Sequence, residues 1–359
     1  MDDAYKQVLI KQGYRFTGEH SAVKVCEWTK KSLVEKGTCY KHKFYGIKSH
    51  RCVQLSAAVN FCNLDCMFCW RERNNSGFGT VDNPSDMIDQ AIRHQKKLLD
   101  GFGGQSGTNW QKYLESKEPA HFAISLNGEN LAYPHISELI EELARRGHSS
   151  FVVTNGMFPH VMEKMHPPTQ LYISLSAPNE KLFNEIDRPM LANGWQRLMN
   201  TMELLPGMRK KTRTVIRLTL INGINTPYLH QFAEIIRKAR PMFIEVKSYM
   251  HVGASTRRLG RENMLSYEAI VEHARNLGQM LGYEIAEHAP ESLVCLMMEK
   301  DTTATRFIDF SEIADRAVVR PSPEYIEQAR KAFQEQVEQA EPVSQEAPAE
   351  LIQIQGLKA

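Results

Sequence analysis

Between about residues 51 and 250, the chain alternates short apolar runs with longer amphipathic stretches. The apolar runs are rich in β-branched residues and predict strands, while the amphipathic stretches predict helices that cover a parallel sheet. Six strands are predicted, at 52–60, 121–126, 150–154, 171–176, 214–221 and 243–249. We therefore expect an α/β fold, a partial (β/α)6 barrel of the TIM-like kind.

The clearest helix of this region is predicted at 135–146. It places four apolar residues at helical spacing on one face, Ile136, Leu139, Ile140 and Leu143. A second amphipathic helix is predicted at 266–281 and a further strand near 293–298, both packed against the barrel. In such folds, the loops that follow the carboxyl ends of the strands carry the chemistry.

The domain organisation is expected to have four parts. Residues 1–50 form an N-terminal extension, residues 51–300 the barrel with its packed additions, and residues 301–333 a C-terminal helical segment. The last part, 334–359, is rich in Glu, Gln, Pro and Ala and has little apolar content before Leu351. Such a composition predicts a disordered or loosely helical tail.

Composition and charge leave most function classes open. The chain has 359 residues, of which 42% are hydrophobic and 24% charged, so a large core is possible. A net charge of +2 neither favours nor excludes nucleic acid, and any basic surface must come from local clusters such as 209–213 and 257–261. No signal pattern and no long apolar run appear, so we expect a soluble cytoplasmic protein without membrane contact.

Six of the seven cysteines lie between positions 26 and 69. In a reducing compartment, crowded cysteines are expected to be metal ligands or catalytic thiols. Cys62, Cys66 and Cys69 follow the first predicted strand with Cys-x3-Cys-x2-Cys spacing. Iron-sulfur clusters usually take four cysteines, so three thiolates suggest an iron left open for a substrate. Cys295 lies in an apolar run, where we expect a buried and inert thiol.

The Cys-x3-Cys-x2-Cys run is similar to the signature of the radical S-adenosylmethionine superfamily. The resemblance implies a [4Fe-4S] cluster whose open iron chelates the methionine moiety of S-adenosylmethionine. An electron passed to the sulfonium then releases a 5′-deoxyadenosyl radical, which abstracts a hydrogen atom from the substrate. A zinc knuckle is the alternative, although zinc prefers paired Cys-x2-Cys units with a second pair or histidines, and only His42 and His50 are near.

The same resemblance implies a set of cofactor contacts in the loops after the strands. The Gly-Glu pair at 128–129 would receive the methionine amino group, because an ammonium needs acceptors and a glycine lets the backbone approach. Asn127 departs from the superfamily, which commonly has a second glycine there. Phe68 would pack near the adenine, with a place in the core as the alternative. Asn155, Ser174 and Ser176 would contact the ribose or carboxylate, with ordinary turn and strand chemistry as the alternative. The full set is Phe68, Asn127, Gly128, Glu129, Asn155, Ser174 and Ser176.

A second set of three cysteines, Cys26, Cys39 and Cys52, has twelve residues in each interval and is suited to a second cluster. Here the sequence resembles the archaeal-type tRNA 4-demethylwyosine synthase family, over roughly residues 20–310. The segments that carry the resemblance are Tyr-Lys-His-Lys-Phe-Tyr-Gly at 40–46, the cysteine loop at 62–70, Asp-Arg-Pro at 187–189, and 243–247 through 251–253.

This second resemblance implies a specific reaction. The family acts on 1-methylguanosine beside the anticodon of phenylalanine tRNA and adds two carbons from pyruvate to form 4-demethylwyosine. The radical removes hydrogen from the N-methyl group, and a second three-cysteine cluster binds pyruvate. A lysine near that cluster can condense with the keto acid. Lys41 is the first candidate and Lys43 the second, against the alternative of a solvated basic loop that faces phosphates.

The expected partners are the anticodon loop of the tRNA, pyruvate and an external electron donor. The donor is implied because the sequence before Cys26 is too short for the flavodoxin-like domain of eukaryotic relatives. We also expect the protein to be a monomer. Trp70 follows the cysteine loop and either stacks on an extruded base or belongs to the core. Two other functions stay open, a radical enzyme with an auxiliary cluster that modifies a peptide or other substrate, and a zinc-stabilised RNA-binding protein.

Overall fold

The computed structural model describes residues 1–72, 75–311 and 321–339. Within them, ten strands form one sheet in the order β1-β2-β3-β4-β5-β6-β7-β8-β10-β9. The strands are β1 (Arg15–Phe16), β2 (Ala22–Val23), β3 (Cys52–Ser56), β4 (His121–Ile124), β5 (Ser149–Thr154), β6 (Gln170–Leu175), β7 (Arg213–Leu220), β8 (Phe243–Ser248), β9 (Glu284–Ala289) and β10 (Val294–Met298).

Strands β3 to β8 are parallel and follow one another in sequence order, whereas the strands at both edges are antiparallel. This is the predicted α/β fold, a parallel-rich sheet of the partial-barrel kind, and the sheet is not closed. The helices are α1 (Asp3–Lys11), α2 (Glu27–Leu33), α3 (Tyr40–Tyr45), α4 (Pro84–Leu98), α5 (Trp110–Ser116), α6 (Ile136–Arg145), α7 (Pro159–Lys164), α8 (Glu180–Ile186), α9 (Gly194–Met208), α10 (Leu229–Ala239), α11 (Tyr267–Leu281), α12 (Thr303–Arg306) and α13 (Pro323–Gln339).

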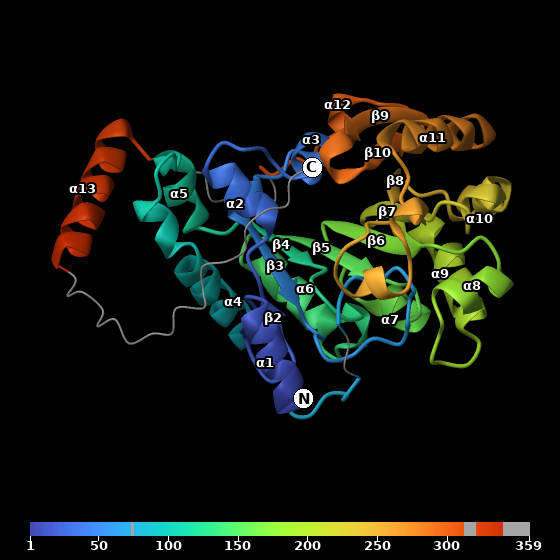
Figure 1. Cartoon of the computed structure of the whole chain (residues 1–359), viewed down its shortest axis with the longest axis horizontal. Coiled ribbons are helices and arrows are strands. Elements are labelled where there is room, and N and C mark those ends of the chain that lie inside the picture. Colours follow the sequence, from blue (N-terminus) through green and yellow to red (C-terminus); the bar gives the residue numbers. More distant parts are fainter. Residues whose placement is uncertain (73–74, 312–320, 340–359) are drawn as a thin grey trace.

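Figure 1 shows β3 to β8 through the centre of the molecule, with α11, β9 and β10 at one edge and α13 beside α5 at the other end. All six strands of the predicted barrel are confirmed, as are the helices at 135–146 and 266–281 and the strand near 293–298. Helix α13 extends beyond residue 333, and residues 340–359 of the predicted tail lie outside the described part. Within that part, no helix is both long and apolar enough to cross a membrane.

The helix boundaries follow from local capping chemistry. Helix α4 begins after Asn83, whose side chain accepts hydrogen bonds from the backbone N–H groups of Ser85 and Asp86, and Pro84 occupies the first turn. Helix α11 begins after Ser266, which caps Ala269 N–H, and ends at Gly282 in the left-handed conformation. These caps orient the crossover helices against the sheet.

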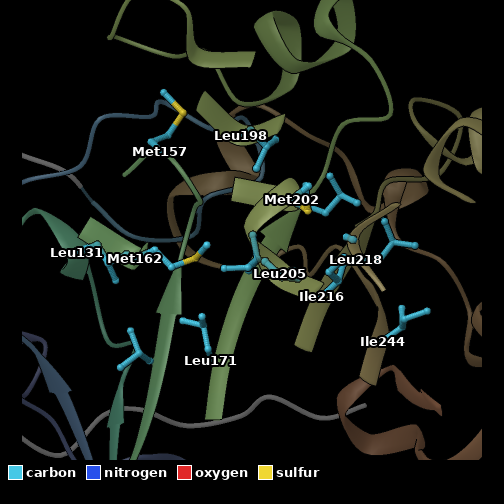
Figure 2. Close-up of a cluster of buried hydrophobic side chains, with 14 of the residues drawn as sticks. Leu131, Met157, Met162, Leu171, Leu198, Met202, Leu205, Ile216, Leu218 and Ile244 are labelled. Carbon is cyan, nitrogen blue, oxygen red and sulfur yellow. The ribbon is translucent and has the colours of Figure 1, made fainter. Parts of the chain in front are cut away.

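The outer face of the barrel carries the largest core. Side chains of successive strand residues point to opposite faces, and the apolar ones on the outer face meet the covering helices. Figure 2 shows this contact, with side chains of α9 and the neighbouring loops directed toward those of the strands. Labelled examples are Leu198, Met202 and Leu205 on α9, and Leu171, Ile216, Leu218 and Ile244 on the strands.

The inner face has a separate apolar layer at one end of the barrel. Phe151, Tyr172, Val215 and Phe243 of β5 to β8 belong to a cluster that includes Phe44 and Tyr45 of helix α3. The side chains of Phe44 and Tyr45 are fully buried. Helix α3 therefore fills this end of the barrel from inside. The next inward-facing positions of the same strands, Val153, Ser174 and Arg217, are partly exposed, and the first two line a cavity.

We expect Leu139→Ala in α6 to lower the free energy of unfolding by about 2–5 kcal/mol, because Leu139 is completely buried and its removal leaves a cavity. Chemical denaturation of the apo-protein measures the change. Glu141→Ala is the control, since Glu141 is exposed on the same helix and its loss should change stability by less than about 0.5 kcal/mol. Similar effects of both substitutions would contradict the assignment of the buried face.

Candidate functional site

The cysteine loop after β3 lies over the carboxyl end of the sheet. Cys62, Cys66 and Cys69 are all partly exposed and line one cavity of about 180 Å³. The loop is held by the segment after α8, because the N–H of Asp65 donates to Asp187 O at 3.0 Å and that of Met67 donates to Ile186 O at 2.8 Å. The three thiols thus face a common space, as their spacing predicts.

Six of the seven predicted cofactor contacts line the same cavity. They come from the cysteine loop and from the loops and ends of three strands, and they are Phe68, Gly128, Glu129, Asn155, Ser174 and Ser176. The structure therefore brings together side chains that are more than one hundred residues apart in the sequence. What each of them binds is taken up below as a proposal.

The Gly128–Glu129 turn packs directly on the cysteine loop. Gly128 has φ +68°, and a Cβ atom there would stand 1.7 Å from the carbonyl oxygen of Ala58. Only glycine fits this approach. The Glu129 carboxylate accepts hydrogen bonds from Thr154 Oγ1 and from the backbone N–H of Asn155, both at 2.7 Å. It thereby joins the loops after β4 and β5, and burial raises its pKa to about 6.

Asn127 differs from the other predicted contacts because it does not line the cavity. Its side-chain amide donates to the Tyr5 hydroxyl and to Val59 O, both at 3.2 Å, and its oxygen accepts from the N–H of Gly128 at 2.9 Å. The amide therefore holds the turn in place from behind. The prediction of a direct contact came from the position of Asn127 in the motif, which does not reveal the direction of its side chain.

Two polar residues that the sequence analysis did not assign also belong to this region, since Asp187 lines the cavity and Asn63 contacts Asn155, which lines it. Asp187 is buried and accepts hydrogen bonds from the Ser176 hydroxyl at 2.6 and 2.8 Å. It also accepts a hydrogen bond from the thiol of Cys66. Burial raises the Asp187 pKa to about 6. Asn63 accepts from the Asn155 amide at 2.7 Å. Both lie in the segments that carry the family resemblance, but only tertiary contacts show that they touch the cysteine loop.

The second cysteine set gathers at the inner end of the barrel. Cys26 precedes α2, Cys39 precedes α3 and Cys52 begins β3, so three separate elements supply one thiol each. Burial raises the pKa of all three thiols, to about 12 for Cys39 and Cys52, and the nearby Lys41 ammonium opposes the rise. The three thiols and Lys41 therefore share one buried electrostatic environment.

The two candidate lysines have opposite environments. Lys41 is 7% exposed, and its Nζ lies 4.4 Å from the ring centroid of Tyr172 and 5.2 Å from that of Phe151. Burial lowers its pKa, and the positive charge of Arg217 acts in the same direction. The Lys43 side chain is 43% exposed and forms an ion pair with Glu291 at 3.6 Å. Only Lys41 points into the barrel.

A buried polar network lies beside Lys41. Glu245 of β8 is completely buried and accepts hydrogen bonds from Tyr45 Oη at 2.9 Å, Tyr40 Oη at 3.2 Å and Arg217 Nε at 3.1 Å. Lys247 faces the same interior, and burial lowers its pKa to about 8. The sequence offers one signal for this network, since Glu245 and Lys247 alternate with apolar residues in a strand that is otherwise buried.

The two predicted basic segments lie at opposite ends of the barrel. Residues 209–213 lead into the amino end of β7, whereas the cysteine loop follows the carboxyl end of β3. In the first segment, Arg209 forms an ion pair with Glu299. The segment 257–261 adjoins the cysteine loop, because Arg258 donates to the carbonyl oxygens of Met67 and Cys69. The basic surface next to the cavity therefore comes from the second segment and not from the first.

Trp70 is 48% exposed beside the cysteine loop and is not a core residue. The Cζ atom of Arg71 lies 3.6 Å from its ring centroid, and the N–H of Ala254 donates to its carbonyl oxygen at 3.0 Å. The adjacent Gly253 has φ +59°, and a Cβ there would stand 2.3 Å from the Trp70 carbonyl oxygen. The backbone of Trp70 is thus held against the loop at 253–254, and its indole stacks on the Arg71 guanidinium.

Comparison with known families matches two regions of the chain. The family described as the radical SAM superfamily matches residues 58–239, and the family described as wyosine base formation matches residues 238–300. The S-adenosyl-L-methionine-dependent tRNA 4-demethylwyosine synthase of Pyrococcus horikoshii is 43% identical over 305 residues, which cover 82% of this chain and 88% of that protein. The chain belongs to the tRNA 4-demethylwyosine synthase family.

Other members of the tRNA 4-demethylwyosine synthase family agree over a similar extent. The synthase of Methanocaldococcus jannaschii is 37% identical over 309 residues, or 84% of this chain and 97% of that protein. A solved structure described as TYW1 with a lysine-pyruvate adduct bound has a TM-score of 0.77 and 35% identity, and it covers 86% of this chain and 99% of that chain. The resemblance seen in the sequence is confirmed.

Membership of the radical SAM superfamily implies S-adenosylmethionine and a [4Fe-4S] cluster. The donor set fits this cluster, because three thiols converge on a cavity that also has buried carboxylates, amides and hydroxyls. Among residues 1–72, 75–311 and 321–339, no three His, Cys, Asp or Glu side chains are arranged to hold a single metal ion. A cluster of four irons and four sulfides needs a wider set of thiols than one ion does.

We expect Gly128→Ala to weaken binding of S-adenosylmethionine at least about tenfold, since the new Cβ forces the turn away from the cysteine loop and the φ angle is unfavourable for alanine by about 1 kcal/mol or more. Equilibrium binding to the reconstituted protein under anaerobic conditions measures the change. Gly79→Ala is the matched control, because a Cβ at Gly79 meets no atom within 4 Å. Unchanged affinity in the Gly128 variant would show that the turn is not part of this site.

Proposed function

We propose that this chain is a radical S-adenosylmethionine synthase that converts 1-methylguanosine beside the anticodon of phenylalanine tRNA, with pyruvate, to 4-demethylwyosine. The observation that carries the proposal is the position of Lys41. This lysine is buried between the second cysteine set and an interior lined by Ser174, which also borders the cavity of the first set. Lys41 contacts the ring of Tyr172, two residues from Ser174 on β6, which supports a common site for the two half-reactions.

The first half-reaction is assigned to the cavity at the cysteine loop. Cys62, Cys66 and Cys69 would hold the cluster that binds S-adenosylmethionine, which supplies an adenosyl radical for hydrogen abstraction. The backbone of Gly128 and the amide of Asn155 would contact the methionine moiety, Phe68 the adenine, and Ser174 and Ser176 the ribose or carboxylate. All five line the cavity, which supports these roles. Glu129 would act mainly by holding the two loops together, because its carboxylate already accepts three hydrogen bonds.

The second half-reaction is assigned to the inner cysteine set. Cys26, Cys39 and Cys52 would hold an auxiliary [4Fe-4S] cluster, since three thiols from separate elements meet beside a buried lysine. Lys41 would form an imine with pyruvate, in which its nitrogen bonds to the keto carbon and the keto oxygen leaves as water. Lys43 is the weaker candidate, because its amine lies at the surface in an ion pair.

The RNA substrate would approach at the rim of the first cavity. Bases of an anticodon loop can be unstacked and drawn into an enzyme pocket at a cost of about a few kcal/mol. The exposed indole of Trp70 and the neighbouring Arg257 and Arg258 offer a stacking surface and positive charge there. An external electron donor and action as a cytoplasmic monomer complete the proposal.

Substitution of Cys62, Cys66 and Cys69 by Ala should leave about half of the iron of the reconstituted wild-type protein, because the inner three thiols are separate ligands. Iron and sulfide analysis under anaerobic conditions measures the content, and the triple Ala variant of Cys26, Cys39 and Cys52 is the reciprocal test. Cys295→Ala should retain all the iron, since this thiol is buried away from both sets. Complete loss or complete retention of iron in the first variant would refute two separate clusters.

The N-methyl group of the tRNA base should be the source of the abstracted hydrogen. With tRNA that carries a trideuterated methyl group, we expect deuterium in the 5′-deoxyadenosine. With unmethylated tRNA, we expect no tricyclic product. Mass spectrometry of the nucleosides after anaerobic turnover with pyruvate measures both. Deuterium that came from labelled pyruvate and not from the methyl group would reverse the roles of the two substrates. A peptide-modifying enzyme would transfer no deuterium from the tRNA and would form no tricyclic product from methylated tRNA.

A further inference from the structure

The interior of the barrel above α3 contains more positive than negative side chains. Lys41, Arg217 and Lys247 face it, and Glu245 is the one buried carboxylate that they surround among the residues the structure describes. An uncompensated cation in a low-dielectric interior is costly unless an anion pairs with it. The thiols of Cys39 and Cys52 offset the charge of Lys41 in part, so the geometry of each cation decides which of them can still bind an anionic ligand.

Arg217 has the geometry of an anion receptor. Its Nε donates to Glu245 Oε2 at 3.1 Å and its Nη2 donates to Tyr40 Oη at 2.7 Å, so one edge of the guanidinium is fixed. Among the described residues, no acceptor is hydrogen-bonded to Nη1, and the side chain keeps 20% of its surface exposed inside the barrel. The fixed edge leaves the opposite edge to a ligand.

The free edge of Arg217 lies near the reactive lysine. Arg217 Cζ is 4.9 Å and Lys41 Nζ 4.4 Å from the centroid of the same ring, that of Tyr172. On the next strand, Ser174 is the register partner of Arg217 and lines the cavity of the first cysteine set. Arg217 thus stands between Lys41 and that cavity.

The third cation, Lys247, already has a hydrogen-bond partner in the protein. The Lys247 amine donates a hydrogen bond to the carbonyl oxygen of Ser292, in the turn between β9 and β10. The nitrogen of Lys41 would be bonded to the keto carbon in the imine, so it is not a separate cation for the carboxylate. Arg217 is therefore the cation of this interior that keeps both its charge and a free donor. Its planar donor edge also matches a carboxylate better than an ammonium does.

We propose that Arg217 binds the carboxylate of the 2-oxo acid whose keto carbon condenses with Lys41, and that Glu245 and Tyr40 are positioning residues that hold the guanidinium. This inference rests on the proposed function and names the residue that recognises its small substrate. The carboxylate of pyruvate is bonded directly to the keto carbon, so an acid held at Arg217 presents that carbon toward Lys41. Recognition of the charge selects 2-oxo acids over neutral ketones and aldehydes.

Imine trapping on the holo-protein tests this without tRNA or S-adenosylmethionine. Pyruvate and its neutral analogue pyruvamide are titrated against the protein with cyanoborohydride, whose hydride reduces the imine to a stable amine. Intact mass and peptide mapping then quantify the adduct on Lys41. The wild type should be half-saturated by pyruvate at a concentration at least about tenfold below that of pyruvamide, since a hydrogen bond to a charged group is worth about tenfold to hundredfold.

Arg217→Gln should raise the half-saturating concentration of pyruvate about tenfold to hundredfold and leave that of pyruvamide unchanged. The double variant Arg217→Gln, Glu245→Gln avoids an unpaired buried carboxylate and should behave in the same way. Lys247→Met is the matched control, which removes a cation of the same interior and should keep the preference for pyruvate. Trapping of pyruvamide reports in every variant that the pocket is folded.

The outcomes separate this inference from the proposed function. Equal weakening of pyruvate and pyruvamide by Arg217→Gln would give Arg217 a purely structural role and overturn the inference. If Lys247→Met also lost the preference for pyruvate over pyruvamide, the preference would come from the total positive charge of the interior and not from a contact with Arg217. That result would overturn the inference as well. Absence of an adduct from the wild type with either compound would overturn the assigned role of Lys41, and with it both conclusions.

Discussion

The buried carboxylate of Glu245 is the constraint on which the inner half of the structure depends. A carboxylate with no exposure must have its oxygens hydrogen-bonded, and Glu245 achieves this with two tyrosines of α3 and one arginine of β7. Because Tyr40 and Tyr45 stand at the two ends of α3, their bonds fix the helix inside the barrel. Cys39 and Lys41 are placed by the same contacts, since they precede and begin that short helix.

The inward-facing residues of the barrel change in character along its length, and this change separates two kinds of chemistry. Near α3 the layer is aromatic and closely packed, with Phe151, Tyr172 and Phe243 as its members. Toward the carboxyl ends of the strands, Ser174, Arg217 and Ser176 replace them. The alternation of side chains along each strand produces this order, because every second residue faces the interior. The interior of the barrel is therefore apolar near α3 and polar toward the carboxyl ends of the strands.

Much of this organisation could be predicted from the sequence, because the signals are local. The strands of the barrel are marked by apolar runs, and the first cysteine set lies within eight residues of one loop. The choice between Lys41 and Lys43 is different. Residues two apart lie on different faces of a helix, so one of them must point away from the barrel, but only the docking of α3 shows which. The Arg217–Glu245 pair likewise depends on strand register, and the direction of the Asn127 amide depends on its contacts with Tyr5 and Val59.

The origin of the inner thiols in three separate elements has a thermodynamic consequence. Cys62, Cys66 and Cys69 are close in any conformation of one short loop, so bringing them together costs little chain entropy. Cys26, Cys39 and Cys52 meet only after α2, α3 and β3 have packed. Any ligand held by these three thiols therefore binds the folded chain and not the unfolded one, and its binding free energy adds to the stability of the fold. The inner ligand would therefore link α2, α3 and β3, which lie far apart along the chain, at one end of the sheet.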